Sequence, residues 1–274
     1  MAELPDEIRR HYAEDFDEDA RIRNGLSELE LVRTQGILRR HLGSGPLRIA
    51  DVGGATGVHS EWLLEDGHEV VLIEPVPEQV DRAKERLGSQ ERFTATVGNA
   101  LALPLESDSC DAVLLMGPLY HLVERSDRVA AFGEAVRVAK PGGLVAAAAI
   151  SRFASLLDGL AREFLFDDAF DEIVRRDLAT GVHQNPERRS AWFTTAYFHH
   201  PNELAEEAST AGLVGVEVLA VEGPVGLFGN LDHRWHNAAD REVMLEATAT
   251  VEAEPALLGA SPHLLLLGYT PTGD

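Results

Sequence analysis

Two features in the N-terminal half of the chain, a glycine turn and a glutamate, have the residue types and spacing to bind a nucleoside. The turn, Gly53 to Gly57 (GGATG), separates an apolar run from a segment with helical spacing. Glycine lets the chain turn tightly and lets a ligand approach the backbone, and the new helix presents unpaired N–H groups. Glu74 ends the next apolar run. Its carboxylate could accept one hydrogen bond from each of the two vicinal hydroxyls of a ribose.

Three histidines could move a proton at neutral pH, because an imidazole titrates near that range. His121 follows a later apolar run in the segment GPLYHL, and His199 and His200 stand in the segment FHHP. All three are candidates for a general base, if the reaction needs one. We find no Cys/His or His/Asp spacing typical of a metal site and no nucleophile elbow. The sequence therefore predicts no metal centre.

The elements that must position these residues alternate between strand and helix. Apolar runs at 47–52, 68–73, 93–97, 111–116 and 144–150 predict five buried strands. Helices are expected between them at 60–66, 77–87 and 128–138. This alternation predicts a parallel sheet with right-handed crossovers. Ligands of such sheets lie across the carboxyl ends of the strands, where the glycine turn, Glu74, Asn99 and His121 all fall.

The sequence pattern predicts four parts in the chain. Residues 1–44 form an N-terminal helical cap, residues 45–150 the ligand-binding core, residues 151–196 a helical insertion that would cover the crevice as a lid, and residues 197–274 the rest of the core, with strands at 214–221 and 263–269. We predict an α/β, Rossmann-like fold with a seven-stranded, mostly parallel sheet and helices on both faces.

Composition excludes several classes of protein. The chain has 46 acidic and 24 basic residues, a formal charge of −22, which disfavours a nucleic-acid partner. No apolar run approaches the roughly 20 residues that span a bilayer, and the N-terminus lacks the apolar core of a signal peptide. We expect a cytoplasmic monomer or homodimer with no membrane partner, in which Cys110, the one cysteine, is a buried small hydrophobe. The scarcity of lysine, limited to Lys84 and Lys140, is typical of either a GC-rich genome or a high-salt cytoplasm.

The motifs, in their order, resemble those of the class I S-adenosylmethionine-dependent methyltransferases. The resemblance covers about residues 45–150 and rests on DVGGATG at 51–57, Glu74, GNALALP at 98–104, DAVLLMGPLYHL at 111–122 and KPGG at 140–143. It implies S-adenosyl-L-methionine as the cofactor and S-adenosyl-L-homocysteine as its product. It assigns Asp51, Gly53 and Gly57 to the methionine side of the cofactor, Glu74 to the ribose, and Asn99 with Ala100 to the adenine. The expected contacts with the cofactor also include Tyr12, Gly54, Ala55, Pro75, Leu101 and Met116.

Two residues depart from the family pattern. Ala55 stands where the family most often has a glycine, and Asn99 where aspartate is commoner. Alanine fits the turn provided that its φ is negative, and Asn99 can still accept an adenine amino proton through its carbonyl oxygen. A dinucleotide-binding oxidoreductase is the competing interpretation of a glycine turn, and the Asp51-x-Gly53 opening and the KPGG turn argue against it.

The resemblance implies that a methyl group moves by in-line displacement to an O, N or C nucleophile of a small molecule. Such a reaction mainly requires that the nucleophile and the methyl carbon be held close together and in line. The alternative left open is a catalytically silent protein that binds the cofactor and serves a regulatory or partner-binding role. Methyl transfer to RNA or protein is disfavoured by the charge. In the resembling family the last strand is antiparallel and lies beside the sixth.

Overall fold

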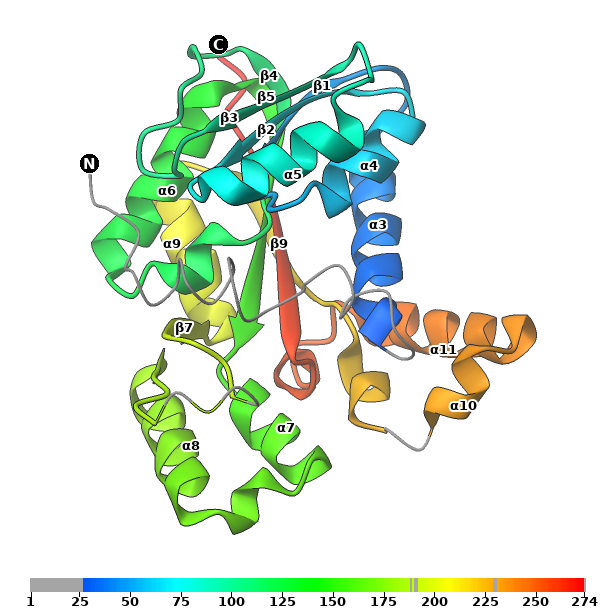
Figure 1. The fold of residues 1–274 in the computed structure, drawn as a ribbon, viewed down its shortest axis with the longest axis vertical. Helices are drawn as coiled ribbons and strands as arrows, with labels where there is room; N and C mark the ends of the chain where they lie inside the picture. The colour runs from blue at the N-terminus through cyan, green and yellow to red at the C-terminus, as the bar shows by residue number, and fades with distance from the viewer. Residues whose placement is uncertain (1–26, 188, 190–191, 229–230, 274) are drawn as a thin grey trace.

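A central sheet organises the chain (Figure 1). The computed structural model describes residues 27–187, 189, 192–228 and 231–273. Over these residues the sheet has nine strands. The strands are β1 (Arg48–Val52), β2 (Glu69–Glu74), β3 (Phe93–Val97), β4 (Cys110–Leu115), β5 (Ala139–Ser151), β6 (Val182–His183), β7 (Ala196–His199), β8 (Val214–Ala220) and β9 (His263–Tyr269).

Helices connect these strands. They are α3 (Glu28–Leu42), α4 (Val58–Glu65), α5 (Pro77–Leu87), α6 (Arg125–Val138), α7 (Ala154–Ala161), α8 (Asp168–Thr180), α9 (Pro201–Thr210), α10 (Asp232–Trp235) and α11 (Ala238–Val251), and a short 3₁₀ helix, η3 (Pro118–His121), follows β4. Strands β3, β2, β1, β4 and β5 lie side by side and parallel, as predicted. Strand β9 runs antiparallel between β5 and β8, which confirms the arrangement that the resemblance implied.

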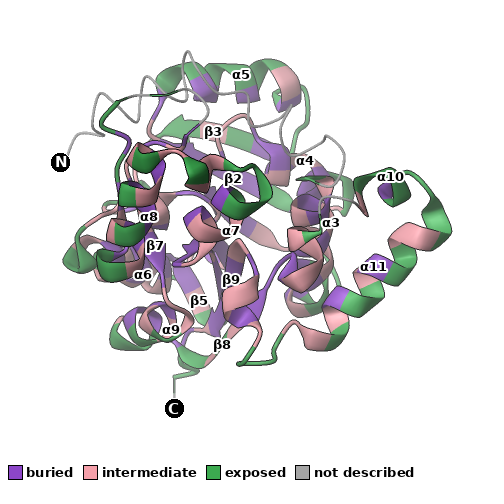
Figure 2. Cartoon of the chain, turned by 90° about the horizontal axis from the view of Figure 1, so that it is seen from below, coloured by how far each residue is buried: buried purple, intermediate pink, exposed green. Residues whose placement is uncertain are grey.

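The two faces of the sheet bury separate hydrophobic cores. Because side chains alternate along a strand, Ile49 of β1 packs with α3, α4 and α5 on one face. Its neighbour Ala50 packs with α6 and α9 on the other face. Figure 2 shows β5 and β9 largely buried, whereas α10 and α11 carry much exposed surface. The predicted layers of helices on both faces are therefore confirmed.

The predicted count of seven strands is wrong. Strand β7 runs parallel to the end of β5, with Ile150 beside Phe198, and β6 pairs antiparallel with β7. These two strands have only two and four residues, too few for an alternating pattern to reveal them. The region 151–196 is therefore not purely helical. Its helices α7 and α8 lie beyond the carboxyl end of β5 (Figure 1).

Helix α6 begins three residues earlier than expected and β5 five residues earlier. Helix α3 buries Leu29, Ile37 and Leu38 and ends before Gly43. The KPGG segment bulges out of β5, since Cys110 pairs with Ala139 but Ala112 pairs with Leu144. Cys110 is fully buried. Tyr12 lies outside the described residues. Among the helices that the structure describes, none has the length and apolar character to cross a membrane.

Candidate functional site

A cavity of about 1370 Å³ lies at the carboxyl edge of the sheet. One part of it is lined by residues that follow the parallel strands, namely Gly53 after β1, Glu74 at the end of β2, Asn99 after β3 and Met116 after β4. The other part is lined by residues of the region 151–196. The sheet therefore gathers most of the predicted site residues around one space.

The glycine turn adopts a backbone that two of its glycines require. Gly53 has a φ of +71°, and a Cβ there would lie 2.8 Å from Cδ of Pro118. Gly57 has a φ of +87° at the start of α4, and a Cβ there would lie 2.8 Å from Cδ1 of Leu87. Gly53 lines the cavity, but Gly57 does not. The requirement for glycine at Gly57 therefore comes from the turn and its packing rather than from a ligand.

Ala55 does not have the negative φ that was expected for an alanine in the turn. Its φ is +46°, in the left-handed region, which costs an L-residue roughly 1–2 kcal/mol. Its backbone N–H donates to Oε2 of Glu74 at 3.2 Å. The left-handed backbone at Ala55 thus accompanies a hydrogen bond that ties the turn to the end of β2.

Asp51 lies beneath the turn rather than in the cavity. Its side chain is fully buried, and its Oδ2 accepts a hydrogen bond from Oγ of Ser60 at 2.7 Å. A Cβ on Gly54 would lie 2.7 Å from the carboxyl carbon of Asp51. Burial raises the pKa of Asp51, against the weaker opposing effect of His59. Asp51 therefore leaves no room for a side chain at Gly54 and does not itself line the cavity.

Glu74 lines the cavity, and its side chain is largely shielded from solvent. The residue is 6% exposed, its Oε1 accepts from the N–H of Val76 at 2.9 Å, and Oε2 accepts from Ala55. Burial raises its pKa to about 7, although both backbone N–H groups lower it. A desolvated carboxylate with remaining lone pairs suits a ligand that donates hydrogen bonds, as two ribose hydroxyls would.

The loop after β3 forms the next wall of the cavity. Oδ1 of Asn99 accepts from the N–H of Leu101 at 2.9 Å, which fixes the side chain. Ala100 and Leu101 line the same wall, and Pro75 and Met116 line the cavity beside it. This mostly apolar wall with one amide suits the faces and polar edge of a purine.

The histidines predicted as bases occupy different environments. His121 lines the cavity, and its ring stacks on Phe193 with centroids 6.1 Å apart. His199 does not line the cavity. It is fully buried, and its Nε2 lies 3.3 Å from Oε2 of Glu207, which pairs with Arg128. His200, at the start of α9, also lies outside the cavity lining. Its ring packs edge-on against Phe153. The sequence could not show that the strand before α9 turns His199 inward.

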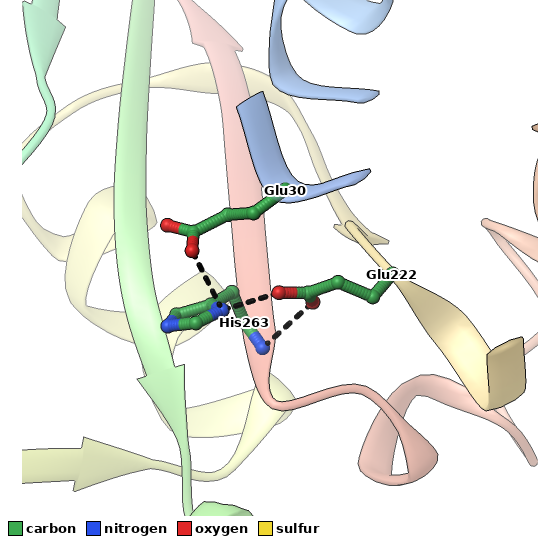
Figure 3. A group of neighbouring side chains, drawn as sticks. All are labelled: Glu30, Glu222 and His263. Carbon is green, nitrogen blue, oxygen red and sulfur yellow. Dashed lines mark hydrogen bonds and ion pairs between the residues drawn. The ribbon is translucent and has the colours of Figure 1, made fainter. Parts of the chain in front are cut away.

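The structure adds three histidines that the sequence did not single out, His59, His183 and His263. Nδ1 of His183 lies 2.7 Å from Oδ2 of Asp177. His263 lies beside Glu222 and Glu30, and Figure 3 shows the three side chains pointing toward one another. They come from β9, the segment after β8, and α3. No sequence motif links residues so far apart.

Aromatic side chains of the region 151–196 and of β7 line the second part of the cavity. Phe170, Trp192, Phe193 and Phe198 line it. Phe170 and Trp192 pack together with ring centroids 5.1 Å apart. This part of the cavity therefore offers apolar, flat surfaces that differ in character from the Glu74 end.

The comparisons with known proteins agree with this geometry. A family model described as a methyltransferase domain matches residues 50–147. An uncharacterized methyltransferase of Mycobacterium tuberculosis is 36% identical over 96 residues, 35% of this chain and 37% of that protein. The match thus spans little more than a third of the relative's length. The ubiquinone biosynthesis O-methyltransferase of Methylocella silvestris is 29% identical over 217 residues, 77% of this chain and 74% of that protein.

Solved structures share the fold. A chain in the complex between the Haloferax volcanii Trm112 methyltransferase activator and a methyltransferase has a TM-score of 0.61 at 18% identity, with 99% of each chain covered. Phosphoethanolamine N-methyltransferase 2 of Haemonchus contortus, solved with S-adenosyl-L-methionine, has a TM-score of 0.54 at 15% identity. The alignment covers 88% of this chain and 52% of the chain from Haemonchus contortus.

The chemistry of the described site fits S-adenosyl-L-methionine. The buried Glu74 carboxylate has two backbone donors and faces the cavity. The turn at Gly53 leaves no room for a side chain, and the Asn99 wall is mostly apolar. Residues 50–147 are therefore a class I S-adenosylmethionine-dependent methyltransferase domain, and the Glu74 end of the cavity fits S-adenosyl-L-methionine as its cofactor.

Proposed function

We propose that this protein transfers a methyl group from S-adenosyl-L-methionine to a small molecule held under the region 151–196. The observation that supports this most is the continuity of the cavity, which extends from Glu74 to the aromatic wall. Its volume of about 1370 Å³ exceeds the roughly 300–1,000 Å³ of a typical single-ligand site. The cavity thus has room for a cofactor and an acceptor together.

In this proposal the chain's own residues bind and align. Glu74 accepts the ribose hydroxyls, the Asn99 loop borders the adenine, and the turn at Gly53 passes the methionine part. The cofactor supplies an electrophilic methyl carbon on a sulfonium. Because the displacement is in line, holding the acceptor atom against that carbon supplies several kcal/mol of the acceleration. Residues 151–196 act as the lid that holds the acceptor and excludes water.

The aromatic wall favours a flat, largely apolar acceptor that carries a hydroxyl, such as a phenol. Phe170, Trp192 and Phe193 offer faces on which a ring can stack. The relative from Methylocella silvestris is named as an O-methyltransferase of ubiquinone biosynthesis, which supports the same acceptor class. A formal charge of −22 disfavours a nucleic-acid acceptor, whose phosphates it would repel.

The test is to incubate the protein with S-adenosyl-L-methionine carrying a deuterated methyl group and to identify labelled products by mass spectrometry. The acceptors offered are 4-methylphenol, catechol, benzylamine and total tRNA. We expect label on the phenols. Label on tRNA alone, or on benzylamine alone, would contradict the proposed acceptor class. Binding of the cofactor without transfer to any acceptor would favour the catalytically silent alternative.

A matched pair of variants tests the acceptor wall. Trp192 is 6% exposed and lines the cavity, whereas Phe166, in the same region, is 85% exposed and does not line it. Trp192→Ala should raise the KM for 4-methylphenol by about tenfold or more, since losing a buried aromatic contact costs over 1 kcal/mol. Phe166→Ala should leave that KM unchanged. Equal effects of the two variants would contradict the proposed acceptor position.

A further inference from the structure

Glu222 and His263 form a carboxylate–imidazole pair (Figure 3), and His263 lines the cavity. Oε1 of Glu222 lies 2.5 Å from Nδ1 of His263. The other carboxylate oxygen of Glu222 is anchored, since Oε2 accepts from Oγ of Ser261 at 2.9 Å and from the backbone N–H of His263 at 3.1 Å. Glu30 contributes a second carboxylate, with its Oε2 3.7 Å from Nδ1. The imidazole is therefore held in one orientation from a rigid strand.

His263 lies where the two parts of the cavity meet. His263 pairs with Ile150 at the carboxyl end of β5, just before α7 begins the region 151–196. Both residues line the cavity, as do Ala154 and Ser155 of α7. An acceptor stacked on the aromatic wall would lie between that wall and the cofactor, and His263 borders that space.

The contact with Glu222 determines which ring nitrogen can take a proton. A carboxylate on Nδ1 favours the tautomer in which Nδ1 carries the hydrogen, and this tautomer presents Nε2 as a base. Figure 3 shows the second ring nitrogen pointing away from Glu222. When Nε2 gains a proton, the carboxylates of Glu222 and Glu30 stabilise the imidazolium. Asp158 of α7 adds a third negative charge that interacts with His263.

Two other histidines of the cavity, His59 and His183, fit this role less well. Nδ1 of His59 accepts from Nε1 of Trp62 at 3.3 Å, and burial lowers its pKa. His183 is held by Asp177, but its side chain is only 2% exposed and its Nε2 already lies 3.3 Å from the carbonyl oxygen of Phe193. The side chain of His263 is 28% exposed. Its carboxylate partner and its access to the cavity together distinguish it.

The same three side chains have the composition of a metal site, because one ligand atom from each of Glu30, Glu222 and His263 lies within 4.8 Å of the others. Oε1 of Glu222 and Nδ1 of His263 are close enough to share a hydrogen bond. A proton between these atoms accounts for the contact, and an ion bound to both would have to replace that proton.

We propose that His263 is the general base of methyl transfer and that Glu222 is its positioning residue. The inference rests on the proposed function, because it requires an acceptor with a proton. The acceptor O–H proton moves to Nε2 of His263 while the oxygen forms its bond to the methyl carbon and the bond between that carbon and sulfur breaks. The products are the methyl ether, the neutral thioether S-adenosyl-L-homocysteine and the protonated imidazole, which then loses its proton to water.

The test compares two phenols that differ in their need for a base. At mildly alkaline pH 4-nitrophenol is largely ionised, whereas 4-methylphenol keeps its proton. His263→Gln should lower kcat/KM for 4-methylphenol by about 100-fold or more, in the usual range for loss of a general base. The same variant should lower kcat/KM for 4-nitrophenol by less than about fivefold, because no proton has to be removed. A merely structural role would lower both by the same factor, and this result would overturn the proposal.

His121→Gln is the matched control, since it makes the same substitution in the same cavity. It should affect both phenols equally. A selective loss with 4-methylphenol in His121→Gln but not in His263→Gln would assign the base to His121 instead. Glu222→Gln keeps an acceptor for Nδ1 but removes the charge, so it should show a smaller selective loss than His263→Gln. Tight binding of zinc ion alone by the wild type, lost in His263→Gln, would overturn the proposal in favour of a metal site.

A second measurement does not depend on the acceptor. Nuclear magnetic resonance of the ring nitrogens, with the protein bound to S-adenosyl-L-homocysteine, reports the tautomer of His263. We expect a neutral ring at alkaline pH with its hydrogen on Nδ1. A hydrogen on Nε2, or a ring that stays doubly protonated at alkaline pH, would overturn the role of His263. Failure of the wild type to methylate either phenol, with the expected tautomer present, would instead count against the proposed acceptor class.

Discussion

Replacing Glu74 by glutamine tests the cofactor site at its most unusual residue. The wild-type carboxylate is 6% exposed, accepts two backbone N–H groups and has a pKa raised by burial to about 7. Glu74→Gln keeps the shape but removes the charge that would accept two ribose hydroxyls. A hydrogen bond to a charged acceptor contributes about 1.5–3 kcal/mol and one to a neutral acceptor about 0.5–1.5 kcal/mol. The variant therefore loses about 3 kcal/mol over two bonds, or about 150-fold in affinity.

The dependence of binding on pH has a defined sign. Hydroxyl donors prefer the ionised carboxylate, so the ligand binds tightly only where Glu74 has lost its proton. The affinity of the wild type should rise with pH up to about 7 and level off above that value. Glu74→Gln carries no titrating group there and should lack this component. Calorimetric titration with S-adenosyl-L-homocysteine between about pH 5.5 and about pH 8.5 measures both curves.

Folding provides the control for this variant. Because the pKa of Glu74 is raised above its ordinary value of 4.5, the ionised group destabilises the unliganded protein, and this cost appears as pH rises from about 4.5 through about 7. The cost is on the order of 3 kcal/mol. Glutamine removes it but leaves one backbone donor unpaired, which costs about 1–3 kcal/mol. We expect unfolding free energies within about 2 kcal/mol at pH above 7. An unchanged affinity in a folded variant, or a flat wild-type pH profile, would refute the assigned role of Glu74.

Three further substitutions test the turn and the core. Ala55→Gly should relieve the left-handed backbone and raise the melting temperature by about 2–4 °C, for a gain of roughly 1 kcal/mol; a lower melting temperature in calorimetry would contradict the strain. Gly54→Ala puts a methyl group 2.7 Å from the carboxyl carbon of Asp51. This variant should bind S-adenosyl-L-homocysteine at least about tenfold more weakly, and full affinity would show that Asp51 does not fix the turn. Arg128→Met removes the buried guanidinium that pairs with Glu207 and leaves this carboxylate, whose side chain is 2% exposed, with His199 and the more distant Arg125. Urea denaturation should show a loss of about 3–5 kcal/mol, and a loss below about 1 kcal/mol would show that the pair is dispensable.

The sequence predicted the parallel core well because that core follows from periodic patterns. The apolar runs that became β3 and β9 were placed at their observed ends, and helix α5 was placed from Pro77 to Leu87. Glu74, Asn99 and His121 stand at or after the carboxyl ends of parallel strands in one sheet, so the topology alone brought them to one edge. The short strands β6 and β7 carry too few residues to show a period, and they were missed.

The parts of the site that could not be predicted depend on long-range contacts. A positive φ at Ala55 cannot be read from residue type, because alanine normally avoids that region. His199 was expected near the ligand but turns into a buried network with Glu207. The group of Glu30, Glu222 and His263 forms only when α3, the end of β8 and the start of β9 meet. No spacing rule joins residues so distant in the chain.

We propose that the glycine turn, Glu74 and the Asn99 loop hold S-adenosyl-L-methionine in the cavity. Calorimetric titration of the full chain with S-adenosyl-L-methionine at pH above 7, repeated with Glu74→Gln, tests it directly. We expect saturable binding at one site per chain, weakened about 150-fold in the variant. The absence of binding by the wild-type protein at millimolar cofactor would contradict it.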